Sequence, residues 1–194
     1  MAGPGTVVRH TRRDGVVGGS GHHGGMAPSS RLAWAVKRLD LSPTHRVLEI
    51  GCGHGVAASA VLDHLTKGQY VGVDRSPAMV EAAQRRNAAA VADGRATFRV
   101  GEVPGVDLGP ARFDRIVAAR VVAMGRPAAL RFAVAHLRPG GRLALVVDSP
   151  DERRTRAQVA ALADALPDAG FEPPTVDETV VDGALVACVS AAVA

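Results

Sequence analysis

Apolar residues follow two different periods along most of the chain, and these periods predict strands that alternate with helices. Short apolar runs are typical of buried strands, whereas intervals of three and four residues are typical of helices with one buried face. A first short helix is expected around Leu32–Leu39, after a capping serine at Ser29 or Ser30. The strands expected further along are 46–50, 70–74, 96–100, 113–118 and 142–148, and the helices expected between or after them are 57–65, 77–91, 127–137 and 159–166.

Two departures from strict alternation complete the predicted fold. Two prolines and two glycines between positions 104 and 110 disfavour a regular helix, so a loop is expected between the third and fourth strands. Near the C-terminus, strands 175–181 and 184–189 flank Asp182-Gly183, a pair that favours a tight hairpin turn. The sequence therefore predicts an α/β fold with a mainly parallel seven-stranded sheet, a C-terminal antiparallel hairpin and helices on both faces.

The first 27 residues differ in composition from the rest of the chain. They are rich in glycine and charge, so a flexible N-terminal arm is expected over residues 1–27 and a single folded domain over 28–194. A length of 194 residues suits one domain with one sizeable core. No apolar stretch reaches the length of a membrane span, and no apolar segment follows the N-terminal arginines, so an unexported protein without a membrane partner is expected.

The cysteine content and the net charge bear on the cellular location and on the class of partner. Cys52 and Cys188 are too few for a disulfide scaffold or a four-cysteine zinc site, and a reducing cytoplasm is the expected location. The formal net charge is +4, and of the 23 basic residues only Lys37 and Lys67 are lysines. GC-biased coding accounts for arginines scattered in this way. A nucleic-acid partner stays open, but the scarcity of aromatic residues for base stacking disfavours it.

The most informative segment is RVLEIGCGHG at residues 46–55, where three glycines alternate between a predicted strand and a predicted helix. Glycines there allow a sharp bend and close approach of a ligand, and a helix start favours an anionic group. The spacing is G-x-G-x-G rather than the G-x-G-x-x-G of dinucleotide-binding folds, which counts against NAD. Asp74 ends the next predicted strand, where a carboxylate can accept hydrogen bonds from a ribose; the alternative is a structural charge before the next helix.

The segment Val47–Gly55 resembles the first motif of class I S-adenosylmethionine-dependent methyltransferases. The resemblance continues in order, and at similar spacing, through 71–76, 113–117 and 137–143, and it covers the chain from about Leu32 to the C-terminus. It implies a Rossmann-like class I methyltransferase fold, S-adenosylmethionine as the cofactor and methyl transfer as the activity. These motifs do not specify the methyl acceptor.

The resemblance also implies a set of cofactor-binding residues. The glycine loop would hold the methionine end of the cofactor, Asp74 its ribose, and Arg75 would lie beside the adenosine. Glu102 stands where the family often has an aspartate near the adenine amino group, and the end of the fourth strand would pass the reactive methyl. The implied residues are Glu49, Gly51, Cys52, Gly53, Gly55, Asp74, Arg75, Gly101, Glu102, Val103, Ala118 and Arg120. No metal is expected, since Ala118-Ala119 lacks the carboxylate of a metal-dependent oxygen methyltransferase.

The expected reaction is in-line displacement of a methyl group onto a small-molecule acceptor. No catalytic base is assigned, because the sequence does not choose among its candidates, His22, His23, His54, Arg120 and Asp148. The chain lacks the motifs of DNA base methyltransferases and a large insertion that would form a lid, which favours a small acceptor. The alternatives are a catalytically inactive cofactor-binding or scaffold protein, and an RNA or protein methyltransferase. A monomer and a homodimer are both compatible with the sequence.

Overall fold

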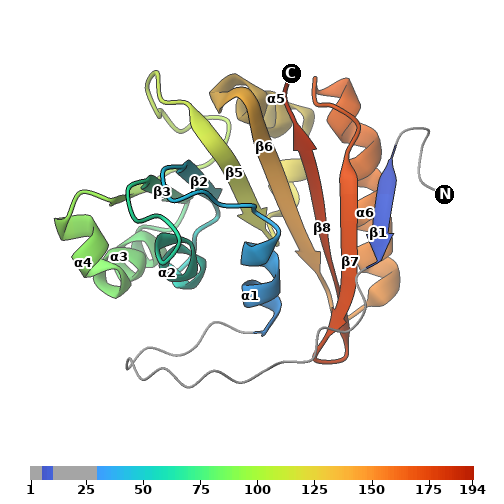
Figure 1. Ribbon diagram of the computed structural model, residues 1–194, viewed down its shortest axis with the longest axis horizontal. Helices are drawn as coiled ribbons and strands as arrows, with labels where there is room; N and C mark the ends of the chain where they lie inside the picture. Colours follow the sequence, from blue (N-terminus) through green and yellow to red (C-terminus); the bar gives the residue numbers. More distant parts are fainter. Residues whose placement is uncertain (1–5, 11–29) are drawn as a thin grey trace.

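The described part of the chain forms a central sheet of eight strands, in the order β1-β7-β8-β6-β5-β2-β3-β4 (Figure 1). The computed structural model describes residues 6–10 and 30–194. Seven of the strands are those that the sequence predicts, and β1 adds an eighth beside β7. The strands are β1 (Val7–His10), β2 (Arg46–Ile50), β3 (Gln69–Asp74), β4 (Ala96–Val100), β5 (Phe113–Ala119), β6 (Leu137–Asp148), β7 (Thr175–Val181) and β8 (Ala184–Ala192).

The strand directions confirm the predicted sheet. Strand β8 runs antiparallel to both of its neighbours, β6 and β7, and every other pairing in the sheet is parallel. The hairpin between β7 and β8 turns at Asp182 and Gly183, whose φ values of 49° and 74° lie in the left-handed region that a type I′ turn requires. The strand order reverses between β2 and β5, the point at which open parallel sheets bind ligands.

Helices cover both faces of the sheet (Figure 1). One layer holds α1 (Ser30–Lys37), α2 (Val56–Leu62), α3 (Pro77–Arg86) and α4 (Ala88–Ala92), and the other holds the 3₁₀ turn η1 (Val122–Gly125), α5 (Pro127–His136) and α6 (Glu152–Asp168). Local caps start two of them: Ser76 Oγ accepts from the Met79 N–H, and Asp151 Oδ1 accepts from the Arg153 N–H. Each layer packs a separate apolar cluster against the sheet.

Two helices stand where the sequence predicts one over residues 77–91. The chain breaks at Asn87, which has φ −108° and ψ 29° and separates α3 from α4. Its buried side chain donates from Nδ2 to the carbonyls of Ala83 (2.9 Å) and Gly55 (3.1 Å) and accepts from Ser59 Oγ (2.8 Å). The uninterrupted helix is therefore wrong, because a tertiary hydrogen-bond network overrides the helical periodicity at this position.

The loop expected between the third and fourth predicted strands is confirmed. Residues 101–112 join β4 to β5 without a helix, so the crossover here carries no helical cover. Thr97 and Arg99 of β4 are exposed on the same side of the sheet, and Val100 is 52% exposed. The outer end of the sheet is thus thinly covered on this face.

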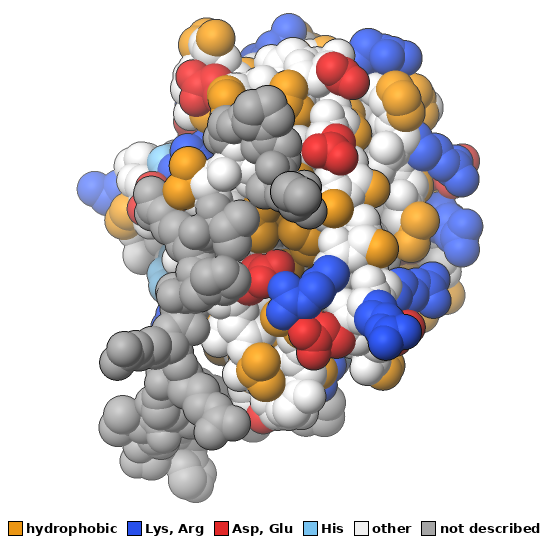
Figure 2. Space-filling model, turned by 90° about the vertical axis from the view of Figure 1, so that its right-hand side faces the viewer, with side chains coloured by type: hydrophobic (Ala, Val, Ile, Leu, Met, Phe, Trp, Pro, Cys, Tyr) orange, Lys and Arg blue, Asp and Glu red, His pale blue; other side chains and the backbone are white. Residues whose placement is uncertain are grey.

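The N-terminal arm expected over residues 1–27 lies mostly outside the described residues. Within it, only residues 6–10 are described, and the division between arm and domain stays a prediction. Figure 2 shows the side of the molecule that faces right in Figure 1, where basic side chains gather along one flank with acidic side chains beside and between them. On this side, Arg156 of α6 contacts Glu152 at 2.9 Å and Glu178 of β7 at 3.2 Å. Among the described helices, none is both long and apolar enough to cross a membrane.

Candidate functional site

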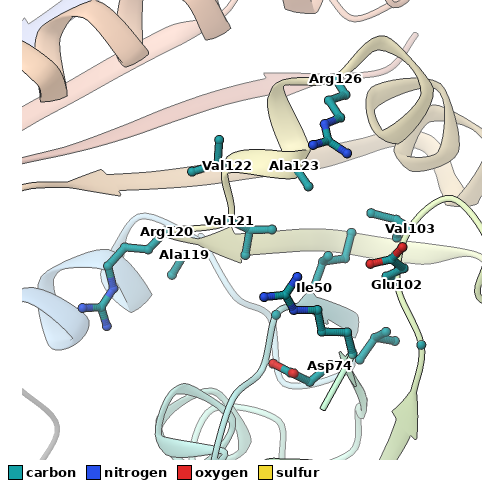
Figure 3. Close-up of a pocket in the computed structure, with 14 residues that line it drawn as sticks. Ile50, Asp74, Glu102, Val103, Ala119, Arg120, Val121, Val122, Ala123 and Arg126 are labelled. Atoms are coloured by element: carbon teal, nitrogen blue, oxygen red, sulfur yellow. The ribbon is translucent and has the colours of Figure 1, made fainter.

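A cavity of about 490 Å³ opens at the carboxyl ends of β2, β3 and β5, beside the loop that follows β4 (Figure 3). It therefore lies at the reversal of strand order between β2 and β5. Its volume falls within the range of about 300–1,000 Å³ that is typical of sites for small molecules and cofactors. The sheet topology and the cavity thus point to the same binding site.

The turn after β2 needs its glycines for the backbone conformation and for space. Gly51, Gly53 and Gly55 have φ values of 79°, 51° and 78°, a region that other residues adopt only with strain. The Gly51 N–H donates to the Val73 carbonyl at 2.8 Å, which fixes the turn against β3. A Cβ on Gly51 would lie 2.5 Å from Cγ2 of Val121, whereas a Cβ on Gly53 would meet no atom within 4 Å. The backbone at Gly53 is therefore open to a ligand.

Asp74, the last residue of β3, is held in place by two backbone donors. Its Oδ2 accepts from the Gly53 N–H at 2.9 Å, and its Oδ1 accepts from the Ser76 N–H at 2.9 Å. These bonds tie the carboxylate to the glycine turn on one side and to the start of α3 on the other. Each carboxylate oxygen keeps a second lone pair, so Asp74 can still accept hydrogen bonds from ligand hydroxyls.

Glu49, the acidic residue that precedes the glycine turn, is buried and does not line the cavity. One of its oxygens accepts a hydrogen bond from the Tyr70 hydroxyl. Burial, together with the negative charge of Asp74, raises the pKa of Glu49 to about 7, while the Tyr70 hydrogen bond acts in the opposite direction. The protonation state of this carboxyl therefore changes near neutral pH.

Cys52 lies within the glycine turn but faces the protein interior, where it is 5% exposed. Burial and the nearby carboxylates of Glu49 and Asp74 raise the pKa of this thiol to about 12. A thiol with so high a pKa stays protonated at neutral pH and is a poor nucleophile. Cys52 therefore acts as a small packing residue.

Three arginines line the cavity, namely Arg75, Arg120 and Arg126. Arg120 follows β5 with a φ of 58°, and Figure 3 shows its side chain directed away from the cavity toward α1. There its Nε lies 3.5 Å from Oδ1 of Asp148, while Nη1 of Arg31 lies 3.5 Å from Oδ2 of the same carboxylate. Arg126 instead points toward the cavity in Figure 3. Arg126 therefore brings a basic group to the cavity from the turn after β5.

Seven of the twelve residues that the resemblance implies line the cavity, and five lie elsewhere. Glu49 and Cys52 are buried on the side of the sheet that α1 and α2 cover. Ala118 is 2% exposed within β5, because the alternation of side chains along a strand turns it into the core. Gly53 and Gly55 shape the turn from outside the cavity wall. The seven lining residues are Gly51, Asp74, Arg75, Gly101, Glu102, Val103 and Arg120.

The cavity also has seven lining residues outside the set that the resemblance implies. Three of them adjoin expected positions: Ile50 ends β2, Val73 precedes Asp74, and Ala119 belongs to the strand end that was expected near the reactive methyl. The segment after Arg120 gave no sequence signal, because η1 is a single 3₁₀ turn with no clear period. The seven residues are Ile50, Val73, Ala119, Val121, Val122, Ala123 and Arg126.

The candidate bases fall in different places. His54 is exposed, and its carbonyl accepts a hydrogen bond from Arg86 Nε at 3.0 Å. Asp148 is held by Arg31 and Arg120 at the end of β6, while His22 and His23 lie outside the described residues. The described residues hold no group of three or more histidine, cysteine, aspartate or glutamate side chains suited to a metal ion.

Comparison with known proteins decides the family. Residues 47–141 match a sequence family described as methyltransferase domain, and these residues contain the glycine turn, Asp74 and the loop beside the cavity. The chain carries a domain of the methyltransferase family, with the Rossmann-like methyltransferase fold. The family and the Rossmann-like fold that the sequence motifs predict are confirmed. Methyltransferase membership also agrees with the position of the cavity at the carboxyl ends of the parallel strands.

The similar proteins are named for different methyl acceptors. The chain is 35% identical over 154 residues to the ribosomal protein L11 methyltransferase of Ralstonia nicotianae, across 79% of this chain and 47% of that protein. It is 38% identical over 128 residues to a protein-L-isoaspartate O-methyltransferase of Azorhizobium caulinodans, across 66% of this chain and 55% of the relative. The solved structure of a geranyl diphosphate methyltransferase in complex with SAM has a TM-score of 0.67, 15% identity and 85% coverage of both chains, which shows a shared fold. This methyltransferase chain spans about half the length of these curated relatives.

Proposed function

We propose that this chain binds S-adenosylmethionine in the 490 Å³ cavity and transfers its methyl group to a small-molecule acceptor. The observation that carries the proposal is the direct hydrogen bond between the glycine turn and Asp74 at the cavity wall. That bond places an open backbone segment and a carboxylate with free lone pairs side by side at the reversal of strand order. Membership of the methyltransferase family supports this choice of cofactor.

The residues present fit the parts of that cofactor. Asp74 would accept the ribose hydroxyls, and the glycine turn, which lines the cavity at Gly51 and is open beside it at Gly53, would face the methionine end. Gly101, Glu102 and Val103, which follow β4, would lie on the adenine side and offer one apolar and one polar side chain. A Cβ on Gly101 would lie 2.8 Å from Val106 Cγ2, so only glycine fits this turn in the cavity wall.

The chain's contribution to the chemistry is alignment and exclusion of water. When bound, the cofactor would supply an electrophilic methyl group on a sulfonium sulfur, which leaves as a neutral thioether. Holding donor and acceptor in line can contribute on the order of 7–11 kcal/mol, so no dedicated base is required for an acceptor that ionises easily. The rim residues Val121, Val122 and Ala123 are apolar, and Val122 is 72% exposed beside the opening. An acceptor with an apolar surface fits this rim, with Arg126 available to an acidic group.

Calorimetric titration with S-adenosylhomocysteine tests the cofactor site. We expect saturable binding to the wild-type chain and an affinity at least tenfold lower for Asp74→Asn, because the amide replaces one of the accepting oxygens with a donor. Asp63→Asn is the matched control, since this exposed aspartate follows α2 and does not line the cavity. No binding to the wild-type protein, or an equal loss in both variants, contradicts the proposed site.

Protein methylation is a second candidate, favoured by the 35% identity to a ribosomal protein L11 methyltransferase. Incubation of the chain with labelled S-adenosylmethionine and fractionated cell extract separates the two. Label in the small-molecule fraction that is lost in Asp74→Asn supports the first proposal, whereas label in protein or RNA supports a macromolecular acceptor. Cofactor binding without transfer to any fraction indicates the inactive, cofactor-binding alternative.

A further inference from the structure

A second cavity, of about 150 Å³, lies at the amino ends of β2, β3 and β4, at the edge of the sheet opposite the methyltransferase cavity. We propose that this basic pocket binds a small dianionic oxyanion, either free phosphate or the terminal phosphate of a small phosphomonoester. Its charged lining consists of Arg46, Arg95 and Arg99, and Gln69 and Thr97 add neutral polar groups. Among the described residues that line it, none is acidic. Three arginines and no acidic residue therefore line this small cavity.

Arg46 provides the observation that points to a ligand. Its Nε is buried and has no hydrogen-bond partner among the described residues. Its guanidinium lies over the ring of Phe113 at 5.8 Å, while its backbone N–H donates to Asp114 Oδ2 at 2.7 Å. The Asp114 carboxylate also accepts hydrogen bonds from Arg138 on both of its oxygens, and it does not pair with the Arg46 side chain. The described residues give this guanidinium no hydrogen-bond acceptor, so its Nη donors are available to an anion in the cavity.

The other two arginines are only partly engaged. Nη1 of Arg95 lies 3.5 Å from the Leu65 carbonyl, and its Nη2 lies 3.6 Å from Asp93 Oδ2, both at the limit of a hydrogen bond. Nη1 of Arg99 donates to the Asp107 carbonyl at 2.8 Å. A guanidinium carries five N–H donors, so both side chains keep donors for an anion in the cavity. Planar guanidinium groups match the geometry of phosphate oxygens.

The pocket exists because the loop 101–112 replaces a crossover helix. A helix in this place would pack on the face of β3 and β4 that carries Thr97 and Arg99, whereas the loop covers it with only Leu108 and Ala111. The volume corresponds to about five water molecules at roughly 30 Å³ each. That space suits an oxyanion of five heavy atoms and excludes a nucleotide, so the rest of a larger ligand would remain in solvent.

The test is a titration of the full chain with inorganic phosphate, glycerol 3-phosphate and dimethyl phosphate. Binding is monitored through the arginine Nε–H signals in NMR spectra. We expect the two dianions to bind with Kd below about 1 mM, and the singly charged diester at least tenfold more weakly. Arg46→Gln should weaken phosphate binding at least tenfold. Arg112→Gln is the matched control and should bind as the wild type does, since Arg112 lies beside the pocket but does not line it. Arg99→Gln, at an exposed position, serves if Arg46→Gln does not fold.

Several results overturn the proposal. One is no saturable phosphate binding up to about 10 mM, and another is an equal loss in Arg112→Gln, which indicates general attraction to a basic surface. Diester binding as tight as monoester binding indicates a nucleic-acid backbone instead of a terminal phosphate. Displacement of phosphate by S-adenosylhomocysteine places the anion in the methyltransferase cavity. The phosphate titration needs no methyl transfer, so its outcome is independent of the proposed function.

Discussion

Replacing Glu49 with glutamine is expected to remove a large pH dependence from the folding stability. Burial raises the pKa of Glu49 to about 7 in the folded chain, from an ordinary value of 4.5. Between these values the folded protein keeps the proton, whereas the unfolded chain releases it. The free energy of unfolding is therefore greatest below the ordinary pKa and falls as the pH rises through about 7. At about 1.36 kcal/mol per pKa unit, the loss amounts to about 3 kcal/mol.

Urea denaturation of the ligand-free protein at a series of pH values measures this effect. The wild-type free energy of unfolding should fall between mildly acidic and mildly alkaline pH, relative to that of Glu49→Gln, whose neutral amide keeps an acceptor for Tyr70. Tyr70→Phe should move the fall to higher pH, because it removes the hydrogen bond that favours the ionised carboxylate. Glu81→Gln is the control, since the Glu81 side chain is 68% exposed on α3 and should leave the pH dependence unchanged.

A constant difference in stability between wild type and Glu49→Gln across this pH range would refute the reasoning. So would a pH dependence that disappears equally in Glu81→Gln, since the exposed Glu81 side chain lies on the surface of α3, away from the buried Glu49. A fall that moves to lower pH in Tyr70→Phe would show that the hydroxyl favours the protonated form of Glu49. The Glu49→Gln comparison thus tests the effect of burial, and the Tyr70→Phe comparison tests the effect of the hydrogen bond.

Three further predictions concern the same region. Gly55→Ala should lower the free energy of unfolding by about 2–4 kcal/mol, because its Cβ would lie 2.9 Å from backbone at a φ of 78°; Gly53→Ala, with no atom within 4 Å, should lower it by only about 1 kcal/mol and yet weaken S-adenosylhomocysteine binding. Asn87→Ala removes three hydrogen bonds and should lower the free energy of unfolding by about 2–4 kcal/mol in urea denaturation. No second substitution at an exposed position should restore the lost stability. Cys52 and Cys188, whose pKa values burial raises to about 12, should resist iodoacetamide in the native protein and react after unfolding; rapid native labelling would contradict their burial.

The sequence predicted best where local chemistry and tertiary structure agree. Ser76 and the following proline start α3 at the predicted position, and Asp182-Gly183 turns the final hairpin as expected. The break at Asn87 could not be predicted, because its cause is a contact with the Gly55 carbonyl on the turn before α2, 32 positions earlier in the chain. Helical periodicity contains no information about such a partner.

The candidate site was predictable to a similar degree. Asp74 and the glycine turn follow from motif spacing, since the carboxyl ends of adjacent parallel strands meet at one edge of the sheet. Whether a side chain such as Cys52 faces the cavity or the interior depends on the path of a single turn, which the motif does not define. Arg126 could not be predicted for a different reason. It reaches the cavity from the end of η1, and a single 3₁₀ turn gives no periodic pattern in the sequence.

The position of β4 at the end of the strand order has a consequence for how copies of the protein meet. Strand β4 is the outermost strand on its side of the sheet, so its backbone groups offer a template to a strand from another molecule. With Val100 52% exposed, this edge carries apolar surface that would favour such pairing. The charge of the exposed Arg99 opposes it, since two approaching copies would bring like charges together. A charge on the solvent side of an edge strand is expected to disfavour edge-to-edge pairing in this way.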